Sequence, residues 1–121
     1  MKRLDQIVRC LGSASIRIGR ESDMQADVES ALVENGIGFI REFPLSAANR
    51  VDFLLTDGIA IECKTDGSRS DVLAQLVRYA RCPEVTALIL VTAKIRLAGK
   101  GSGLINGKPW TAIWVAPRAS L

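Results

Sequence analysis

Two apolar segments separated by a short polar turn constrain the fold of this chain more than any other feature. Residues 51–55 (VDFLL) and 59–64 (IAIECK) flank Thr56-Asp57-Gly58, which has the composition of a hairpin loop. A three-residue loop that ends in glycine gives a register in which every pair on one face is apolar. The opposed pairs are then Leu55 with Ile59, Phe53 with Ile61 and Val51 with Cys63. A two-residue loop would lose that burial, so the sequence predicts an antiparallel hairpin in the first register.

The other face of the same hairpin carries charge. In the predicted register Asp52 lies directly across from Glu62, with Cβ atoms roughly 4.5–5.5 Å apart, and Lys64 follows two residues along. Two carboxylates at about 5 Å repel by on the order of 3 kcal/mol at an effective dielectric near 20, so the pair favours a cation between them. Oxygen ligands beside a lysine suit Mg²⁺ or Mn²⁺. The alternative is a Glu-x-Lys pair on a strand surface, with Asp52 in solvent.

Patterns elsewhere predict a mixed α/β domain. Apolar spacing predicts a helix over 3–11, and a capping box formed by Ser22 and Gln25 predicts a helix that ends near 35–36. The further expected elements are a strand over 37–43 that ends at Pro44, a helix from Ser68 to Arg81, a buried strand over 86–93 and a closing strand over 110–115. The glycine-rich stretch 98–109 is expected to be a surface loop, either a flexible basic loop that grips a DNA backbone or, more simply, a long surface hairpin. This order predicts an α/β sandwich with a mixed central sheet.

The charge is distributed unevenly along the chain. Residues 1–20 hold five Lys or Arg and one Asp, residues 94–121 hold five and no acid, and residues 21–93 carry a net charge of −6. Basic ends around an acidic centre are typical of a polyanion-binding protein with a cation site, although basic ends that only solvate the chain give the same pattern. We expect one domain over 1–121, with a helical extension (1–20), a catalytic core (21–93) and a basic loop with a closing strand (94–121).

Several absences narrow the chemistry. The chain has no histidine, which excludes Ser-His-Asp hydrolysis and histidine metal sites. Its three cysteines form no CxxC pair, which fits neither a zinc site nor a disulfide framework. The sequence has no apolar run of signal-peptide or membrane-spanning length, so we expect a cytoplasmic protein with no membrane contact. The stretch 98–103 lacks the Gly-Lys-Ser/Thr ending of a phosphate-binding loop, so no nucleotide cofactor is expected.

Several of these residues together resemble the PD-(D/E)XK nuclease superfamily. The resemblance runs from about Met24 to Val91, and Val51 stands where the name-giving proline would be. The residues that carry it are Glu29 in the first core helix, Asp52, the run Glu62-Cys63-Lys64, and Gln75 with Tyr79 at helical spacing. The resemblance implies a restriction-endonuclease-like core, with helices on both faces of the central sheet, and hydrolysis of DNA phosphodiester bonds.

The resemblance also implies a role for each of these residues. Asp52, Glu62 and the backbone carbonyl of Cys63 would hold Mg²⁺, with Mn²⁺ as a substitute. Lys64 would position the attacking water and stabilise developing negative charge. Glu29 would hold a metal-bound water or a second metal, unless it is an ordinary solvent-facing helix carboxylate. Gln75 would lie among the catalytic residues with Tyr79 beside the DNA, unless both belong to an ordinary helix edge.

Basic residues supply the remaining candidate DNA contacts, which are Arg50, Lys94, Arg96, Lys100 and Lys108. Arg50 would either touch a phosphate or balance the carboxylates. Trp110 and Trp114 share a strand face, for which core or dimer packing is favoured over base stacking. The resemblance to small Holliday-junction resolvases implies a homodimer that cuts branched DNA. The alternatives are a general or restriction-like nuclease of a phage or mobile element, and a non-catalytic nucleic-acid-binding module with the same fold.

Overall fold

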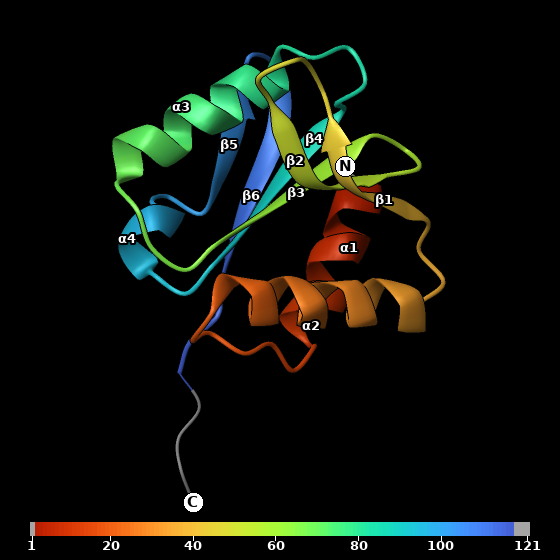
Figure 1. The fold of residues 1–121 in the computed structure, drawn as a ribbon, viewed down its shortest axis with the longest axis vertical. Coiled ribbons are helices and arrows are strands. Elements are labelled where there is room, and N and C mark those ends of the chain that lie inside the picture. Colours follow the sequence, from red (N-terminus) through yellow and green to blue (C-terminus); the bar gives the residue numbers. More distant parts are fainter. Residues whose placement is uncertain (1, 118–121) are drawn as a thin grey trace, which may run out of the picture.

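The computed structural model describes residues 2–117. Its elements in chain order are α1 (Lys2–Gly12), α2 (Glu21–Glu34), β1 (Phe39–Pro44), β2 (Arg50–Leu55), β3 (Ile59–Lys64), α3 (Arg69–Ala80), β4 (Ala87–Thr92), α4 (Ile95–Ala98), β5 (Ser102–Ile105) and β6 (Lys108–Trp114). The strands form one six-stranded sheet in the order β1-β2-β3-β4-β6-β5 (Figure 1). β3, β4 and β6 run parallel, and the other neighbours are antiparallel. The chain is a mixed α/β protein, as the sequence predicted.

Helices cover both faces of the sheet because its central strands are apolar on both sides. α1 and α2 pack on one face, over a core that includes Phe53 and Ile61. α3 packs on the other face, over a core that includes Leu88 and Trp110. Every residue of β4 is buried, which explains its continuous apolar sequence. Within residues 2–117, no helix has the length and apolar character needed to cross a membrane.

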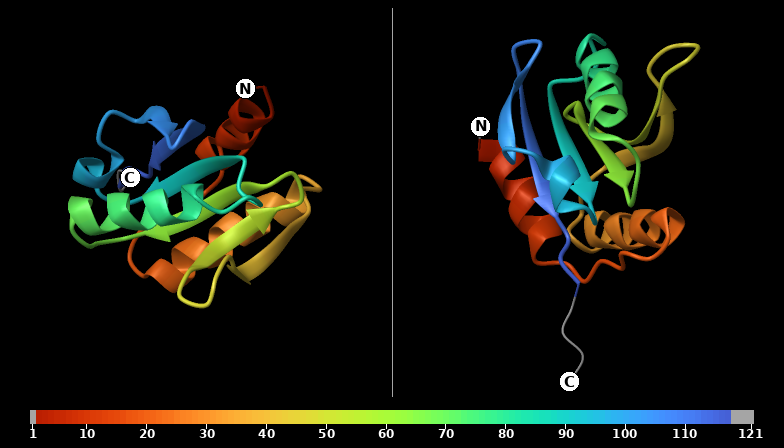
Figure 2. Two further views of the ribbon diagram at one scale, coloured as in Figure 1. Left: turned by 90° about the horizontal axis from the view of Figure 1, so that it is seen from above. Right: turned by 90° about the vertical axis from the view of Figure 1, so that its left-hand side faces the viewer.

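The carboxyl ends of the parallel strands meet at one edge of the sheet. Lys64 ends β3 and is the register partner of Thr92 at the end of β4, which in turn pairs with Trp114 at the end of β6. α4 follows β4 at this edge, on the side of the molecule that faces the viewer in the right view of Figure 2. Ligand sites in open α/β sheets lie outside the carboxyl ends of strands, so this edge is where a functional site is expected.

The predicted hairpin register is confirmed. Phe53 pairs with Ile61 and Leu54 with Ala60, and the two strands are joined by the predicted turn at 56–58. The predicted pair of Val51 with Cys63 is wrong, because Val51 packs on the α3 face, whereas Phe53 and Cys63 belong to the core on the other face. The cause lies beside it, where Glu42 has a φ of 53° and the pairing of β1 with β2 skips the position opposite Asp52. The alternation of side chains along β2 therefore breaks at Asp52.

Several predicted boundaries also differ from the structure. α2 begins at Glu21 with Arg20 as its N-cap residue and no side-chain cap, so the predicted capping box at Ser22 is wrong. β1 begins at Phe39, two residues later than predicted. The stretch 98–109 contains β5 and a turn at 106–107 in which both residues have positive φ, the geometry of a tight hairpin. The predicted cap at Ser68 is confirmed, because its side chain accepts a hydrogen bond from the Asp71 amide.

Candidate active site at the forked hairpin

The β2–β3 hairpin forks at the pair formed by Asp52 and Glu62. Regular backbone pairing extends to Phe53 and Ile61. Beyond this pair, side-chain carboxylates accept the hydrogen bonds of the backbone amides. The Asp52 amide donates to Glu62 Oε1 at 3.0 Å, and the Cys63 amide donates to Asp52 Oδ2 at 2.8 Å. Each carboxylate thus accepts from an amide of the opposite strand, which a buried N–H group requires once its backbone partner is gone. Asp52 and Glu62 face each other as the sequence predicted.

Burial makes this pair of carboxylates electrostatically unfavourable. Glu62 is 4% exposed, and burial, followed by the charge of Asp52, raises its pKa to about 8. Burial also raises the pKa of Asp52, and the charge of Glu21 adds to this effect. Both shifts mean that the doubly ionised pair is disfavoured at neutral pH. The fork therefore favours a bound proton or a bound cation.

Lys64 lies beside this pair on the solvent side. Its Nζ atom is 3.7 Å from Glu62 Oε2, and its side chain is 23% exposed. Arg50 is exposed at the first position of β2, at the same end of the hairpin, and its guanidinium donates to the carbonyl of Glu42 at 3.4 Å. The predicted neighbours of the carboxylate pair are thus brought together at the mouth of the fork. One ammonium group for two carboxylates leaves room for a further positive charge.

Tyr79 and Gln75 reach the fork from α3. Gln75 Nε2 donates to the Tyr79 hydroxyl at 2.7 Å. The same hydroxyl lies 2.8 Å from the Arg50 carbonyl and 3.1 Å from Glu62 Oε2, to one of which it donates its single proton. Because Tyr79 is 1% exposed, its predicted place on the DNA surface is wrong. It holds Glu62 from inside the protein, and Gln75 orients it.

Of the acidic side chains of α2, Glu21 and not the predicted Glu29 acts on Asp52. The carboxylate of Glu29 is 2.7 Å from Nη1 of Arg41, whose guanidinium also stacks over the Phe53 ring at 4.7 Å. Glu21, two helical turns earlier, accepts from the Thr65 amide at 3.4 Å and acts on the pKa of Asp52. Gln25 lies between them, where its Oε1 atom accepts from Arg41 Nη2 at 3.3 Å and its side chain lowers the pKa of Asp52. Sequence reasoning missed Glu21 because it placed the N-cap at Ser22, two residues later than the observed N-cap, Arg20.

The predicted basic contacts fall at two opposite ends of the sheet. Lys94 and Lys100 are exposed near α4, at the same edge as the fork. Arg96 binds Asp66 at 2.8 Å and the Gly67 carbonyl at 2.6 Å, which ties α4 to the segment between β3 and α3. Lys108 begins β6 at the far end, where its Nζ donates to the Cys82 carbonyl at 2.9 Å. Lys108 is therefore remote from the carboxylates.

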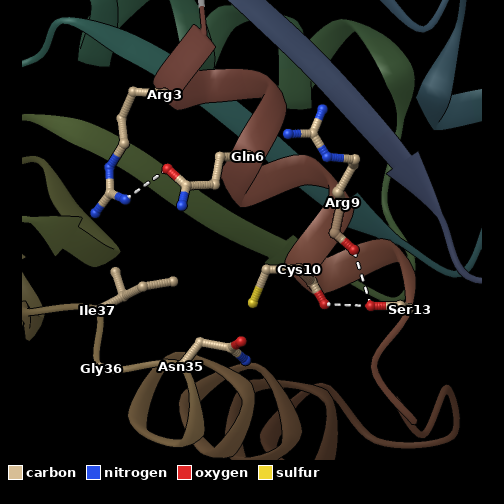
Figure 3. Close-up of a pocket in the computed structure, with 8 residues that line it drawn as sticks. All are labelled: Arg3, Gln6, Arg9, Cys10, Ser13, Asn35, Gly36 and Ile37. Atoms are coloured by element: carbon tan, nitrogen blue, oxygen red, sulfur yellow. Dashed lines mark hydrogen bonds between the residues drawn. The ribbon is translucent and has the colours of Figure 1, made fainter.

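A separate pocket of about 320 Å³ lies between α1 and the end of α2 (Figure 3). Its eight lining residues include no carboxylate, and several of its polar groups are already paired. Gln6 accepts from Arg3 at 3.0 Å, and the Ser13 hydroxyl contacts the Arg9 carbonyl at 2.9 Å. Arg3 also binds Asp57 in the hairpin turn, which places this pocket at the opposite end of the hairpin from the fork. It is not part of the carboxylate site.

The oxygen donors at the fork suit a hard cation. Among the described residues, no group of three or more His, Cys, Asp or Glu side chains is arranged to hold a metal ion. Mg²⁺ needs no such cage, because it usually binds through one or two carboxylates and completes its shell with water and substrate phosphate. Asp52 and Glu62 meet that requirement, and burial of like charge gives them a reason to bind a cation. The Cys63 thiol is buried, which raises its pKa, so the thiolate is not a metal ligand here.

Comparison with known proteins gives no match among family models, curated proteins or solved structures. The geometry of the fork is therefore the basis for assigning a function.

Proposed function

We propose that this protein is a metal-dependent endonuclease with a restriction-endonuclease-like core that hydrolyses DNA. The observation that carries the proposal is the pair of carboxylates formed by the half-buried Asp52 and the buried Glu62, which meet at a forked strand end with Lys64 beside them. Removing like charges from water costs free energy that their mutual repulsion does not repay, so stability does not explain this pair. Such a pair is typical of a cation site that works on phosphate.

Each residue at the fork then has a defined part in the reaction. Asp52, Glu62 and the Cys63 carbonyl would hold Mg²⁺, which polarises a phosphate and lowers the pKa of water. Lys64 presents its ammonium group on the solvent side, where it stabilises negative charge that develops on the phosphate. Tyr79 fixes the Glu62 carboxylate from within. Glu21 is placed to orient water near Asp52, the part that the sequence suggested for Glu29.

The exposed cations near the fork support a nucleic-acid substrate. Lys94 and Lys100 extend the positive surface from Lys64 along α4. Such a surface binds the phosphate backbone and releases counterions. We propose branched DNA as the substrate and a homodimer as the active form, in line with the resemblance to Holliday-junction resolvases. A general nuclease would use the same residues on linear DNA.

A cleavage assay tests this function. End-labelled four-way junction, flap, nicked and linear duplex DNA would be incubated with the protein in EDTA, Mg²⁺ or Mn²⁺. We expect cleavage in Mg²⁺ or Mn²⁺ but not in EDTA, with the junction cut faster than its linear arms. Glu62→Gln and Lys64→Ala should each reduce the rate by at least about a hundred-fold. The matched control Lys108→Ala, at the far end of the sheet, should cut like the unaltered protein.

The outcomes separate the candidate functions. Equal cutting of linear and branched DNA would favour the general nuclease. No cleavage of any substrate by a folded protein would overturn the enzyme assignment. Salt-dependent DNA binding without cleavage would then favour the second candidate, a non-catalytic binding module. The observation in favour of that candidate is that both carboxylates already accept hydrogen bonds from backbone amides, which stabilises the fork without a metal.

A further inference from the structure

Trp114 lies on the same face and edge of the sheet as the proposed catalytic residues. Register pairs Lys64 with Thr92 and Thr92 with Trp114, so two strand spacings, roughly 10 Å, separate the backbones of Lys64 and Trp114. Side chains of β6 alternate, and Trp110 packs on the α3 face, so Trp114 projects to that face as well. Glu62 meets Tyr79 of α3 there. Trp114 is therefore a near neighbour of the fork.

The indole of Trp114 is held in a fixed orientation but is not covered. Its Nε1 atom donates to the Ala93 carbonyl at 3.3 Å, and the residue is 45% exposed. Trp110, on the same strand, is 9% exposed and belongs to the core. Single exposed apolar residues are common on protein surfaces, so what singles out Trp114 is its fixed, accessible ring on the same edge of the sheet as the fork.

The surroundings of Trp114 indicate the chemistry of that ligand. Lys94 and Lys100 are exposed on the neighbouring α4 segment, and Asp66, the nearby acid of the β3–α3 segment, is bound by Arg96. An exposed aromatic ring within a positively charged surface is the usual arrangement for binding single-stranded nucleic acid, in which bases stack on the ring and phosphates meet the cations. A fully paired duplex offers no free base face away from its ends.

We propose that Trp114 stacks on an unpaired base of the substrate. This inference rests on the proposed function and deepens it: the substrate is DNA with unpaired bases within about 10 Å of the cleaved bond, about three stacked nucleotides. Flaps, bulges and opened junction centres fit this description, and continuous duplex does not. The sequence alone favoured core or dimer packing for this residue, because its exposure is a property of the fold.

Fluorescence titration tests the stacking. A short single-stranded oligonucleotide and a hairpin duplex of the same length would be added to the protein in EDTA, so that no cleavage occurs. We expect the single strand to quench emission, which the exposed Trp114 and not the buried Trp110 would report. In anisotropy titrations with a dye-labelled single strand, which need no tryptophan signal, Trp114→Leu should weaken binding by about ten-fold, while Trp114→Phe keeps most of the affinity. Leu104→Ala, a change at a 72% exposed apolar residue on β5, is the matched control and should bind normally.

Two further measurements make the result decisive. Equal oligonucleotide affinity for the Leu and Phe variants would overturn the inference, as would a dimer that dissociates on Trp114→Leu without any change in DNA affinity. Cleavage rates for flap and linear DNA show which proposal fails. Normal cleavage with unchanged substrate preference in Trp114→Leu removes the stacking role and leaves the nuclease. Single-strand binding that depends on Trp114 in a protein that never cleaves leaves the stacking role and removes the nuclease.

Discussion

Protonation of Glu62 is linked to folding because its carboxyl group is buried. Its pKa rises from the ordinary value of 4.5 to about 8 in the folded protein, so between these values the folded state holds a proton that the unfolded state has released. We expect the free energy of unfolding to fall as pH rises from about 4.5 to about 8, by up to roughly 1.4 kcal/mol per pH unit. Urea denaturation across this range measures the slope.

Glu62→Gln supplies the control for this pH dependence. The amide keeps the shape of the side chain and does not ionise, so the variant should lose most of the slope. If Mg²⁺ binds the fork, adding it should stabilise the unaltered protein more at pH 8 than at pH 5, because the cation replaces the proton. A slope that is the same in both proteins would contradict the assigned burial of charge at Glu62.

Tyr79→Phe removes one hydroxyl that serves three groups. Gln75 Nε2, the Arg50 carbonyl and Glu62 Oε2 all lie within 3.1 Å of that oxygen. Leaving buried polar groups unpaired should cost about 1–3 kcal/mol in the free energy of unfolding. The hydroxyl also lowers the pKa of Glu62, so the pH range of decreasing stability should extend upward in the variant. Denaturant titrations at several pH values measure both effects.

Arg81→Ala is the comparison for this change, because Arg81 is exposed at the end of the same helix. Its effect should stay within about 0.5 kcal/mol. Under the proposed function, Tyr79→Phe should also weaken Mg²⁺ binding by about ten-fold, which calorimetry measures. Unchanged stability in Tyr79→Phe would show that the hydroxyl does not make these bonds.

At the level of elements, the β2–β3 turn is fixed by Gly58. Its φ is 90°, and a Cβ there would lie 2.6 Å from the backbone oxygen of Glu84. Gly58→Ala should therefore lower the free energy of unfolding by about 2 kcal/mol or more, since it combines backbone strain with a clash against main chain. Thermal unfolding measures the loss. Gly12→Ala is the matched control, because a Cβ at Gly12 meets nothing within 4 Å, and an unchanged or slightly higher Tm is expected.

The hairpin also shows what sequence can predict about this fold. Its register was predictable because only one pairing buries Phe53, Ile61 and their neighbours together, and that register fixes Asp52 opposite Glu62. The placement of Val51 on the α3 face could not be predicted, because it depends on the positive φ of Glu42 on a different strand. The stretch 98–109 was considered as a surface hairpin, for which Asn106-Gly107 is a strong signal, but β5 was not assigned as a strand. Four exposed or half-buried residues give β5 too little apolar alternation for pattern reasoning.

The candidate site was predictable to the same extent. Residues on one hairpin, such as Asp52 and Lys64, follow from local register. Residues on helices do not, because the face that a helix turns to the sheet depends on where it starts and how it packs. A shift of two residues at the start of α2 left Glu21 out of the prediction. The exposure of a side chain also depends on the packing of distant segments. For this reason the sequence suggested DNA contact for Tyr79, which is buried, and core or dimer packing for Trp114, which is exposed.

At the scale of the whole molecule, the two basic ends of the chain differ in how their charged side chains are paired. Arg3 binds Asp57 at 2.7 Å and Arg17 binds Asp27 at 3.0 Å, so part of the amino-terminal charge is used to attach residues 1–20 to the acidic core. Lys94 and Lys100, by contrast, remain exposed at the edge of the fork. In the carboxyl-terminal region Arg96 is paired with Asp66, so Lys94 and Lys100 are the exposed cations beside the fork that are placed to meet phosphate.

This division predicts how DNA binding responds to salt. Each phosphate neutralised on single-stranded DNA contributes about −0.7 to the slope of log K against log salt, and each on duplex DNA about −0.9. Replacing both Lys94 and Lys100 by alanine should therefore make the slope shallower by about 1.4 on single-stranded DNA and about 1.8 on duplex DNA, and weaken binding at low salt. Fluorescence anisotropy over a salt series measures the slope. Lys108→Ala removes the same kind of charge, but at the far end of β6, where the ammonium is held by Cys82. If all three lysines contributed equally, DNA would be attracted by net charge alone; a slope that responds only to the α4 pair locates the DNA path beside the fork.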